Sequence, residues 1–162
     1  MNSRDWCFMW LGVLVAVIAV VAIGKLNKAR AADWAVATIG SQHLGGGDFC
    51  EQNPGGGLEL SANGSQTRSL LGVYRNSLRE DDRGCRTWSL YAGKSWLPFS
   101  VREWRFGGAA MGILGYESAV TLGVAMVISY ERERHGFNLV VFPDRKGNLG
   151  QGVVGVQLKR AF

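Results

Sequence analysis

From about residue 33 onward, apolar positions alternate with small or polar ones at a period of two. This period, interrupted at short intervals by Gly, Asn, Asp and Pro, predicts strands joined by turns rather than helices. The pattern predicts eight strands, at residues 34–44, 55–62, 68–78, 86–97, 101–115, 120–130, 137–142 and 152–162. We therefore expect an all-β chain that forms one domain, an eight-stranded antiparallel up-and-down β-barrel over residues 33–162.

The bulky residues share one face of several predicted strands. At residues 120–130, Val124, Met126 and Ile128 alternate with Gly123 and Ala125. A face of Gly, Ser and Thr suits a narrow lumen, so the bulky face is expected to point outward into hydrocarbon. The alternative is a soluble, lipocalin-like barrel that holds the bulky residues inside.

Aromatic residues fall near the predicted strand ends, where the interfacial girdles of a membrane barrel would lie. They are Trp34, Trp88, Trp96, Trp104, Tyr116 and Tyr130.

The first 32 residues differ from the rest. Residues 7–24 carry no charge, a length that suits either a long signal-peptide core or a short membrane helix. The small residues of Ala29-Arg30-Ala31 favour cleavage near Ala31 or Ala32 and export of the barrel. The basic residues that follow the apolar run favour the alternative, an uncleaved signal anchor that holds a periplasmic barrel at the inner membrane.

Charge and composition argue against nucleic-acid binding and against a metal or cofactor site. The formal net charge is +5, but much of the excess flanks the N-terminal apolar segment, so nucleic acid is not an expected partner. The two histidines and the absence of a close cysteine pair predict neither a metal site with zinc spacing nor a cofactor. An arginine-rich stretch could meet anionic lipid head groups or form a solvated loop; it comprises Arg75, Arg79, Arg83 and Arg86.

Strand parity places every second connection at the same end of the barrel. His43 follows the first strand and Asn76-Ser77 the third, so a histidine and a hydroxyl are expected at one rim. Such a pair is the minimum for acyl transfer, with the imidazole as general base, although it could equally be a loop contact. Cys50 and Cys85 fall on two different loops at this same end of the barrel and could form a disulfide, or be two unrelated thiols.

Three stretches resemble one family of bacterial barrels. They are EQNPGGGLEL at 51–60, LGVYRNS at 71–77 and YAGKSWLP at 91–98, and the closing Phe162 agrees. They are similar to those of the outer-membrane lipid A palmitoyltransferases, eight-stranded barrels that move an acyl chain from phospholipid to lipid A. The resemblance implies that His43 and Ser77 are catalytic. Asn76 stands where the family has an aspartate, and an amide cannot carry the charge that would stabilise an imidazolium.

The resemblance also implies substrates and a location. It implies a monomeric outer-membrane protein that binds phospholipid and lipopolysaccharide, with Arg75 and Arg79 holding phosphates. The acyl chain would lie in a slot of small residues, Gly107, Ala109 and Gly123, which could otherwise simply fill a narrow barrel. A non-enzymatic barrel that binds lipid or alters the cell surface is the alternative function.

Overall fold

The structure is a computed structural model, and it describes residues 33–45, 49–61, 66–77, 87–116, 120–143 and 152–162. The predicted signal peptide or signal anchor at 1–32 lies outside these residues. Among the described residues, no helix is long and apolar enough to cross a membrane. Eight strands account for most of them: β1 (Trp34–His43), β2 (Gly55–Ser61), β3 (Thr67–Arg75), β4 (Trp88–Val101), β5 (Trp104–Leu114), β6 (Thr121–Arg132), β7 (His135–Phe142) and β8 (Val153–Ala161).

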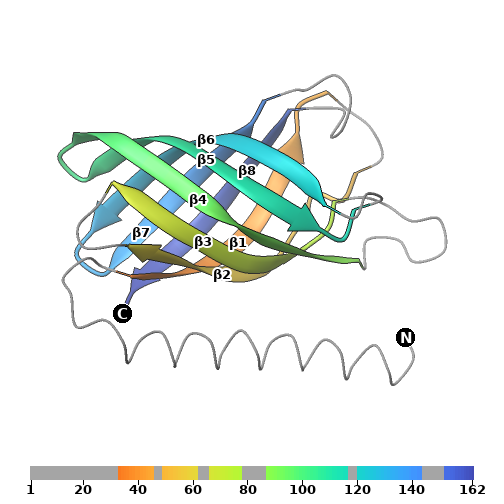
Figure 1. Ribbon diagram of the computed structural model, residues 1–162, viewed down its shortest axis with the longest axis horizontal. Coiled ribbons are helices and arrows are strands. Elements are labelled where there is room, and N and C mark those ends of the chain that lie inside the picture. Colours follow the sequence, from red (N-terminus) through yellow and green to blue (C-terminus); the bar gives the residue numbers. More distant parts are fainter. Residues whose placement is uncertain (1–32, 46–48, 62–65, 78–86, 117–119, 144–151) are drawn as a thin grey trace. The chain divides into compact units, whose positions relative to one another are not determined.

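The strands form a closed barrel (Figure 1). Each strand pairs antiparallel with its neighbours in sequence, and β8 closes the sheet against β1 over Trp34–His43. The predicted eight-stranded up-and-down barrel is confirmed for this part of the chain. Because closure leaves no free sheet edge, every strand has a neighbour on both sides.

One predicted turn is wrong. The turn expected near Pro98, between the predicted strands at 86–97 and 101–115, lies instead at Arg102 and Glu103, because β4 continues through Pro98 to Val101 and pairs there with Trp104. Proline lacks a backbone N–H and is tolerated in a strand at an irregularity. The register of β4 against β5 shifts between Trp96 and Phe99, which supplies that irregularity.

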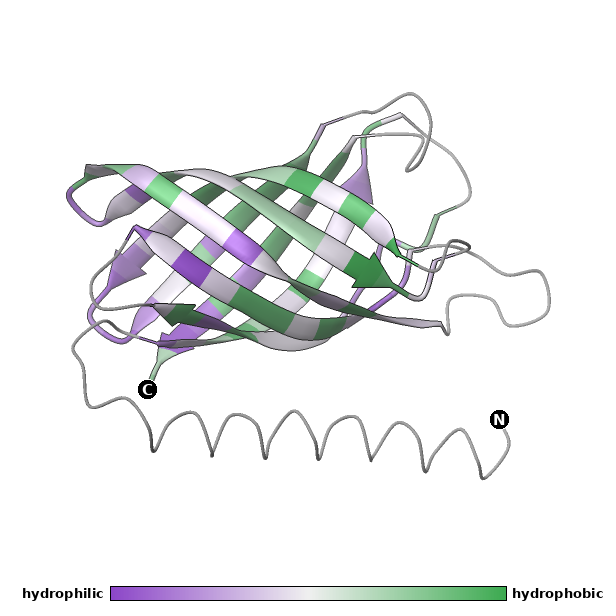
Figure 2. Ribbon diagram, viewed as in Figure 1, coloured by the Kyte–Doolittle hydropathy of each residue, from purple (hydrophilic) through white to green (hydrophobic). Residues whose placement is uncertain are grey.

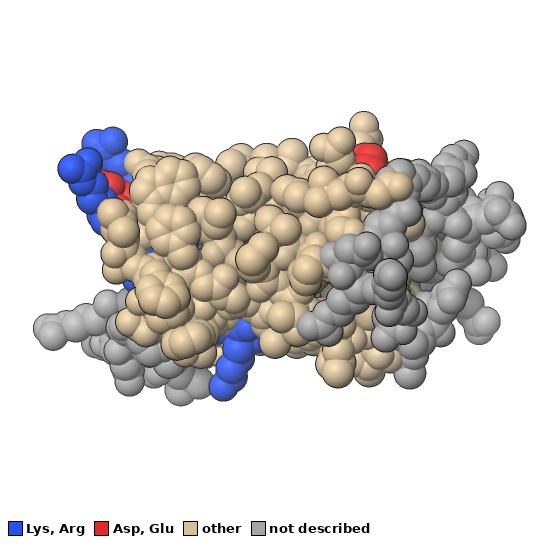
Figure 3. Space-filling model, turned by 90° about the horizontal axis from the view of Figure 1, so that it is seen from above, with Lys and Arg blue, Asp and Glu red and all other residues tan. Residues whose placement is uncertain are grey.

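Along most of β6 the outward side chains are bulky and the inward ones small, as the alternation predicts, although the inward Val127 is also bulky. Along β6, Val124 and Met126 are 42% and 59% exposed, whereas Ala125 and Ser129 are 2% and 0% exposed. These bulky residues of β6 therefore lie on the outer face, and not inside as the lipocalin-like alternative expected. Apolar positions recur along the strands in Figure 2, and a wide belt of uncharged residues covers the face seen in Figure 3.

The aromatic residues divide between the two faces. Trp88, Trp96 and Trp104 are exposed on the outer wall, where Trp104 packs edge-on against Tyr130 at 5.1 Å and against Phe137 at 5.7 Å between ring centroids. Trp34 and Tyr116, which the sequence assigned to the same girdles, face the lumen instead: Trp34 is 2% exposed and Tyr116 lines the cavity described below. Alternation alone misplaces residues at the very end of a strand.

One end of the lumen is closed by charged side chains. Glu131 accepts hydrogen bonds from Arg68 and Arg105, each at 2.9 Å, and from Lys159 at 2.7 Å. Glu59 accepts from Arg68 at 2.9 Å and Lys159 at 3.3 Å. Lys159 also lies 4.8 Å from the centre of the Trp34 ring. We call Glu59, Arg68, Arg105, Glu131 and Lys159 the lumen ion cluster; it forms a floor of paired charges.

Candidate functional site

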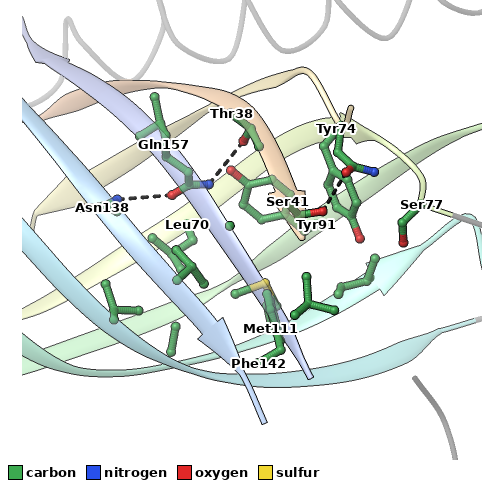
Figure 4. Close-up of a pocket in the computed structure, with 18 of the residues that line it drawn as sticks. Thr38, Ser41, Leu70, Tyr74, Ser77, Tyr91, Met111, Asn138, Phe142 and Gln157 are labelled. Carbon is green, nitrogen blue, oxygen red and sulfur yellow. Dashed lines mark hydrogen bonds between the residues drawn. The ribbon is translucent and has the colours of Figure 1, made fainter. Parts of the chain in front are cut away.

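A cavity of about 570 Å³ occupies the lumen, and Figure 4 shows some of the residues that line it. It reaches from His43 and Ser77, at the end of the barrel where β1 and β3 finish, down to Glu59 and Asn138. Its volume lies within the roughly 300–1,000 Å³ that is usual for small-molecule sites. Much of its lining is apolar: Val36, Leu70, Leu97, Ala109, Met111, Ile113, Val127, Val140 and Phe142.

The polar lining residues largely bond to one another. Gln157 accepts a hydrogen bond from Asn138 at 3.2 Å and donates one to Thr38 at 3.3 Å, and Figure 4 shows both bonds along one wall. Nearer the rim, the Ser41 hydroxyl donates to the Asn53 side chain at 2.6 Å. Most of these polar atoms already have partners, and the exception is the buried side-chain oxygen of Asn138, so the wall as a whole places little demand for hydrogen bonds on a ligand. The cavity can therefore take a largely apolar molecule.

The Tyr91 side chain accounts for two glycines on the two strands that precede it in the barrel. Its side chain lies across Gly57 of β2 and Gly72 of β3, and a Cβ at Gly72 would come within 2.5 Å of the Tyr91 hydroxyl oxygen. The two glycines form a shallow trough that admits the ring. Tyr91 is thereby held against the wall and lines the cavity without filling it.

His43 lies at the rim, buried between two neighbours. The Phe49 ring stacks on the imidazole with centroids 4.1 Å apart and planes 8° from parallel. A carboxylate oxygen of Glu51 lies 3.4 Å from Nδ1 of His43. A carboxylate at Nδ1 favours the tautomer that carries its proton there, which leaves Nε2 as the basic nitrogen.

Ser77 lines the same cavity as His43, as the sequence predicted for this end of the barrel. Its carbonyl oxygen accepts a hydrogen bond from the backbone N–H of Cys50 at 2.9 Å, which ties the segment after β1 to the residue that follows β3. A hydroxyl and an imidazole on the wall of one apolar cavity are the groups that acyl transfer needs.

Asn76, the third predicted catalytic residue, is placed differently. Its side-chain amide donates to the hydroxyl of Ser89 at 3.1 Å and to the carbonyl oxygen of Gly115 at 2.9 Å. It is 1% exposed and does not line the cavity. Asn76 therefore joins the ends of β3, β4 and β5.

The predicted slot of small residues is present only in part. Ala109 lines the cavity, whereas Gly107 and Gly123 do not. A Cβ at Gly123 would meet Phe142 at 3.1 Å and Ile113 at 3.2 Å, so larger neighbours fill the space beside it. The cavity wall is consequently made of medium-sized apolar side chains rather than of glycine.

The remaining predicted site residues lie at or beyond the rim. Arg75 ends β3 on the outer face, opposite the side of Tyr74, and Arg79 lies outside the described residues. Cys50 takes part in a disulfide, while Cys85 also lies outside the described residues, so the Cys50–Cys85 pairing stays a prediction. In the part of the chain that the structure describes, no three His, Cys, Asp or Glu side chains gather in a way that could hold a metal ion.

Two features of the site were not predicted, and the sequence offered a signal for only one of them. Glu59 and Lys159 occupy inward positions within strands whose outward positions are Leu58, Leu60 and Leu158, so their charges had to meet partners in the lumen. The sequence offered no signal for the contact between Glu51 and His43. Glu51 lies between β1 and β2, and outside strands the alternation does not predict where a side chain points.

No protein-family model matches the chain, and no curated protein matches it either. The chemistry of the cavity must therefore be inferred from the closed barrel, its apolar wall and the side chains at its rim.

Proposed function

We propose that this protein is an outer-membrane barrel that transfers an acyl chain from a phospholipid to lipid A. The observation that carries the proposal is the lumen cavity, which is largely apolar and has a histidine and a serine on its wall at one end. The three stretches that resemble the lipid A palmitoyltransferases support the same reaction. The proposed location rests on the apolar outer wall and its exposed tryptophans.

In the proposed reaction the acyl chain lies in the cavity with its ester carbonyl near the rim. Nε2 of His43 accepts the hydroxyl proton as Ser77 Oγ bonds to the carbonyl carbon. The ester C–O bond then breaks, and the proton passes to the departing lysophospholipid oxygen. A hydroxyl of lipid A attacks the acyl-serine by the same exchange, which restores the Ser77 hydroxyl and leaves the chain on lipid A.

The experiment that tests this proposal uses purified barrel in detergent, a phospholipid with a deuterated acyl chain, and lipid A. We expect mass spectrometry to find the deuterated chain on lipid A, with an equal amount of lysophospholipid. If the barrel is folded and neither product forms, the proposed reaction is wrong. Tight binding of labelled phospholipid without transfer would instead identify the non-enzymatic lipid-binding barrel, which the amide at Asn76 favours.

A prediction about stability follows from the proposed membrane location. Lys94 is exposed on the outer wall in the middle of β4, whereas Arg75, Arg132 and Arg160 face outward near strand ends. A lysine on the lipid face at mid-membrane costs about 2–4 kcal/mol. Lys94→Leu is therefore expected to raise the free energy of unfolding in lipid vesicles by about 2 kcal/mol.

The matched control is Arg132→Leu, which changes a charge at the end of β6 and is expected to leave stability in vesicles nearly unchanged. Urea unfolding followed by tryptophan fluorescence measures both. If the wall faced water, Lys94→Leu would bring no such gain and would lower the solubility of the barrel in buffer instead.

A further inference from the structure

The segment that follows β1 runs back alongside it. The backbone N–H of Ser41 donates to the carbonyl oxygen of Glu51 at 3.1 Å, and the backbone N–H of His43 donates to the Glu51 carboxylate at 3.2 Å. Glu51 is thereby held beside the end of β1 by its main chain as well as by its side chain. Its position is set by the strand that carries His43.

The same segment fixes the imidazole of His43 in two ways. Phe49 covers one face of the ring, which restrains its tilt, and Glu51 meets Nδ1 at the ring edge, which restrains its rotation. The His43 side chain is 4% exposed while that of Glu51 is 49% exposed. The Glu51 carboxylate therefore contacts both water and the buried ring.

Cys50, between Phe49 and Glu51, links this segment to the other predicted catalytic residue. Its backbone N–H donates to the carbonyl oxygen of Ser77, and its sulfur takes part in a disulfide. Three consecutive residues therefore contact His43 twice and Ser77 once.

Asn76 does not supply the carboxylate that would support a catalytic histidine. Its amide group bonds to Ser89 and Gly115, and it does not line the cavity. An amide at that position supplies no negative charge, yet a histidine that acts as a base becomes positively charged during the reaction. Glu51 is the carboxylate that lies next to that ring.

We propose that Glu51 orients His43 and stabilises its charged form, in place of the acid that is missing at position 76. This inference rests on the proposed acyl transfer. Glu51 acts through His43 and is a positioning residue. It fixes the proton on Nδ1, so that Nε2 is free to accept a proton from the attacking hydroxyl, and its charge offsets that of the imidazolium.

The test compares Glu51→Gln, Glu51→Asp and Asn76→Asp in the deuterated-acyl assay. Loss of the carboxylate that supports a catalytic histidine can cost up to about 10⁴-fold. For Glu51, half exposed and 3.4 Å from the ring, we expect a decrease in kcat of about 10²-fold with little change in KM. Glu51→Asp should regain a substantial part of the lost rate, and Asn76→Asp should not raise it. A Glu51→Gln enzyme with the kcat of the original protein would overturn the proposal.

A second measurement separates this inference from the proposed function. The ¹⁵N spectrum of His43 reports which ring nitrogen carries the proton, in a folded barrel and without any turnover. We expect the Nδ1–H form in the original protein and a mixture of tautomers in Glu51→Gln. Identical spectra for the two would overturn the role of Glu51 even if acyl transfer is found. If the spectra are as expected but the barrel transfers no acyl chain, only the proposed function is refuted.

Discussion

Replacing His43 with alanine is expected to lower the rate of acyl transfer by about 10³-fold, because a positioned general base contributes roughly 10²–10⁴-fold. The ring is held by Phe49 and Glu51 at the rim of the cavity that Ser77 also lines. Among the described residues, no other imidazole lines this cavity to take the proton from the attacking hydroxyl. Ser77→Ala should lower the rate comparably, since it removes the nucleophile.

The chain offers a matched control in His135, its only other histidine. His135 is exposed at the start of β7, next to the short turn after β6 and at the opposite end of the barrel from His43. His135→Ala should leave the rate of acyl transfer within about twofold, as surface substitutions usually leave a fold intact. The account is contradicted if His43→Ala keeps most of the activity, or if both variants lose it equally.

Glu131→Gln is expected to lower the free energy of unfolding by about 3–5 kcal/mol, which is the usual cost of removing one partner from a buried ion pair. Glu131 accepts hydrogen bonds from Arg68, Arg105 and Lys159. The substitution keeps the size of the side chain but leaves three cations beside the single carboxylate of Glu59. Lys159 is fully buried, so water cannot compensate for the loss.

Glu133→Gln is the control for this second prediction. Glu133 has the same side chain two residues further on, but it is exposed at the first position of the β6–β7 turn with a φ of 52°. Because Gln tolerates that backbone conformation about as well as Glu, its stability should change by less than about 0.5 kcal/mol. Unfolding by urea in detergent measures both variants. A difference of less than about 1 kcal/mol between them would show that the lumen ion cluster contributes little to stability.

The strands and the direction of their side chains could be predicted because both follow from local rules. A period of two places alternate residues on opposite faces, and the contrast between Val124 or Met126 and Ala125 decides which face is inside. The turn at Arg102–Glu103 could not be predicted in the same way. Two ordinary charged residues form it, while the stronger turn signal, Pro98, is accommodated by a register shift.

The site could be predicted only in its broad placement. Parity brings the ends of β1 and β3 to one end of the barrel, which is why His43 and Ser77 line one cavity. Parity does not give the path of a connection. The contact between Glu51 and the His43 ring could therefore not be predicted from strand parity. The hydrogen bonds from the Asn76 amide to Ser89 and Gly115 could not be predicted either. Nor could it show that neighbouring Ile113 and Phe142 cover Gly123.

The central claim, that the bulky wall contacts hydrocarbon, can be tested directly on β6. Spin labels at single cysteines replacing Val124, Met126 and Ile128 would be examined in barrels reconstituted into lipid vesicles, with a label at Arg132 as the reference for the strand end. The account predicts that the three labels collide often with oxygen, which dissolves in hydrocarbon, and rarely with a water-soluble nickel chelate, whereas the label at Arg132 shows the reverse. If the chelate reaches Met126 as readily as Arg132, the wall faces water and the proposed lipid chemistry is wrong.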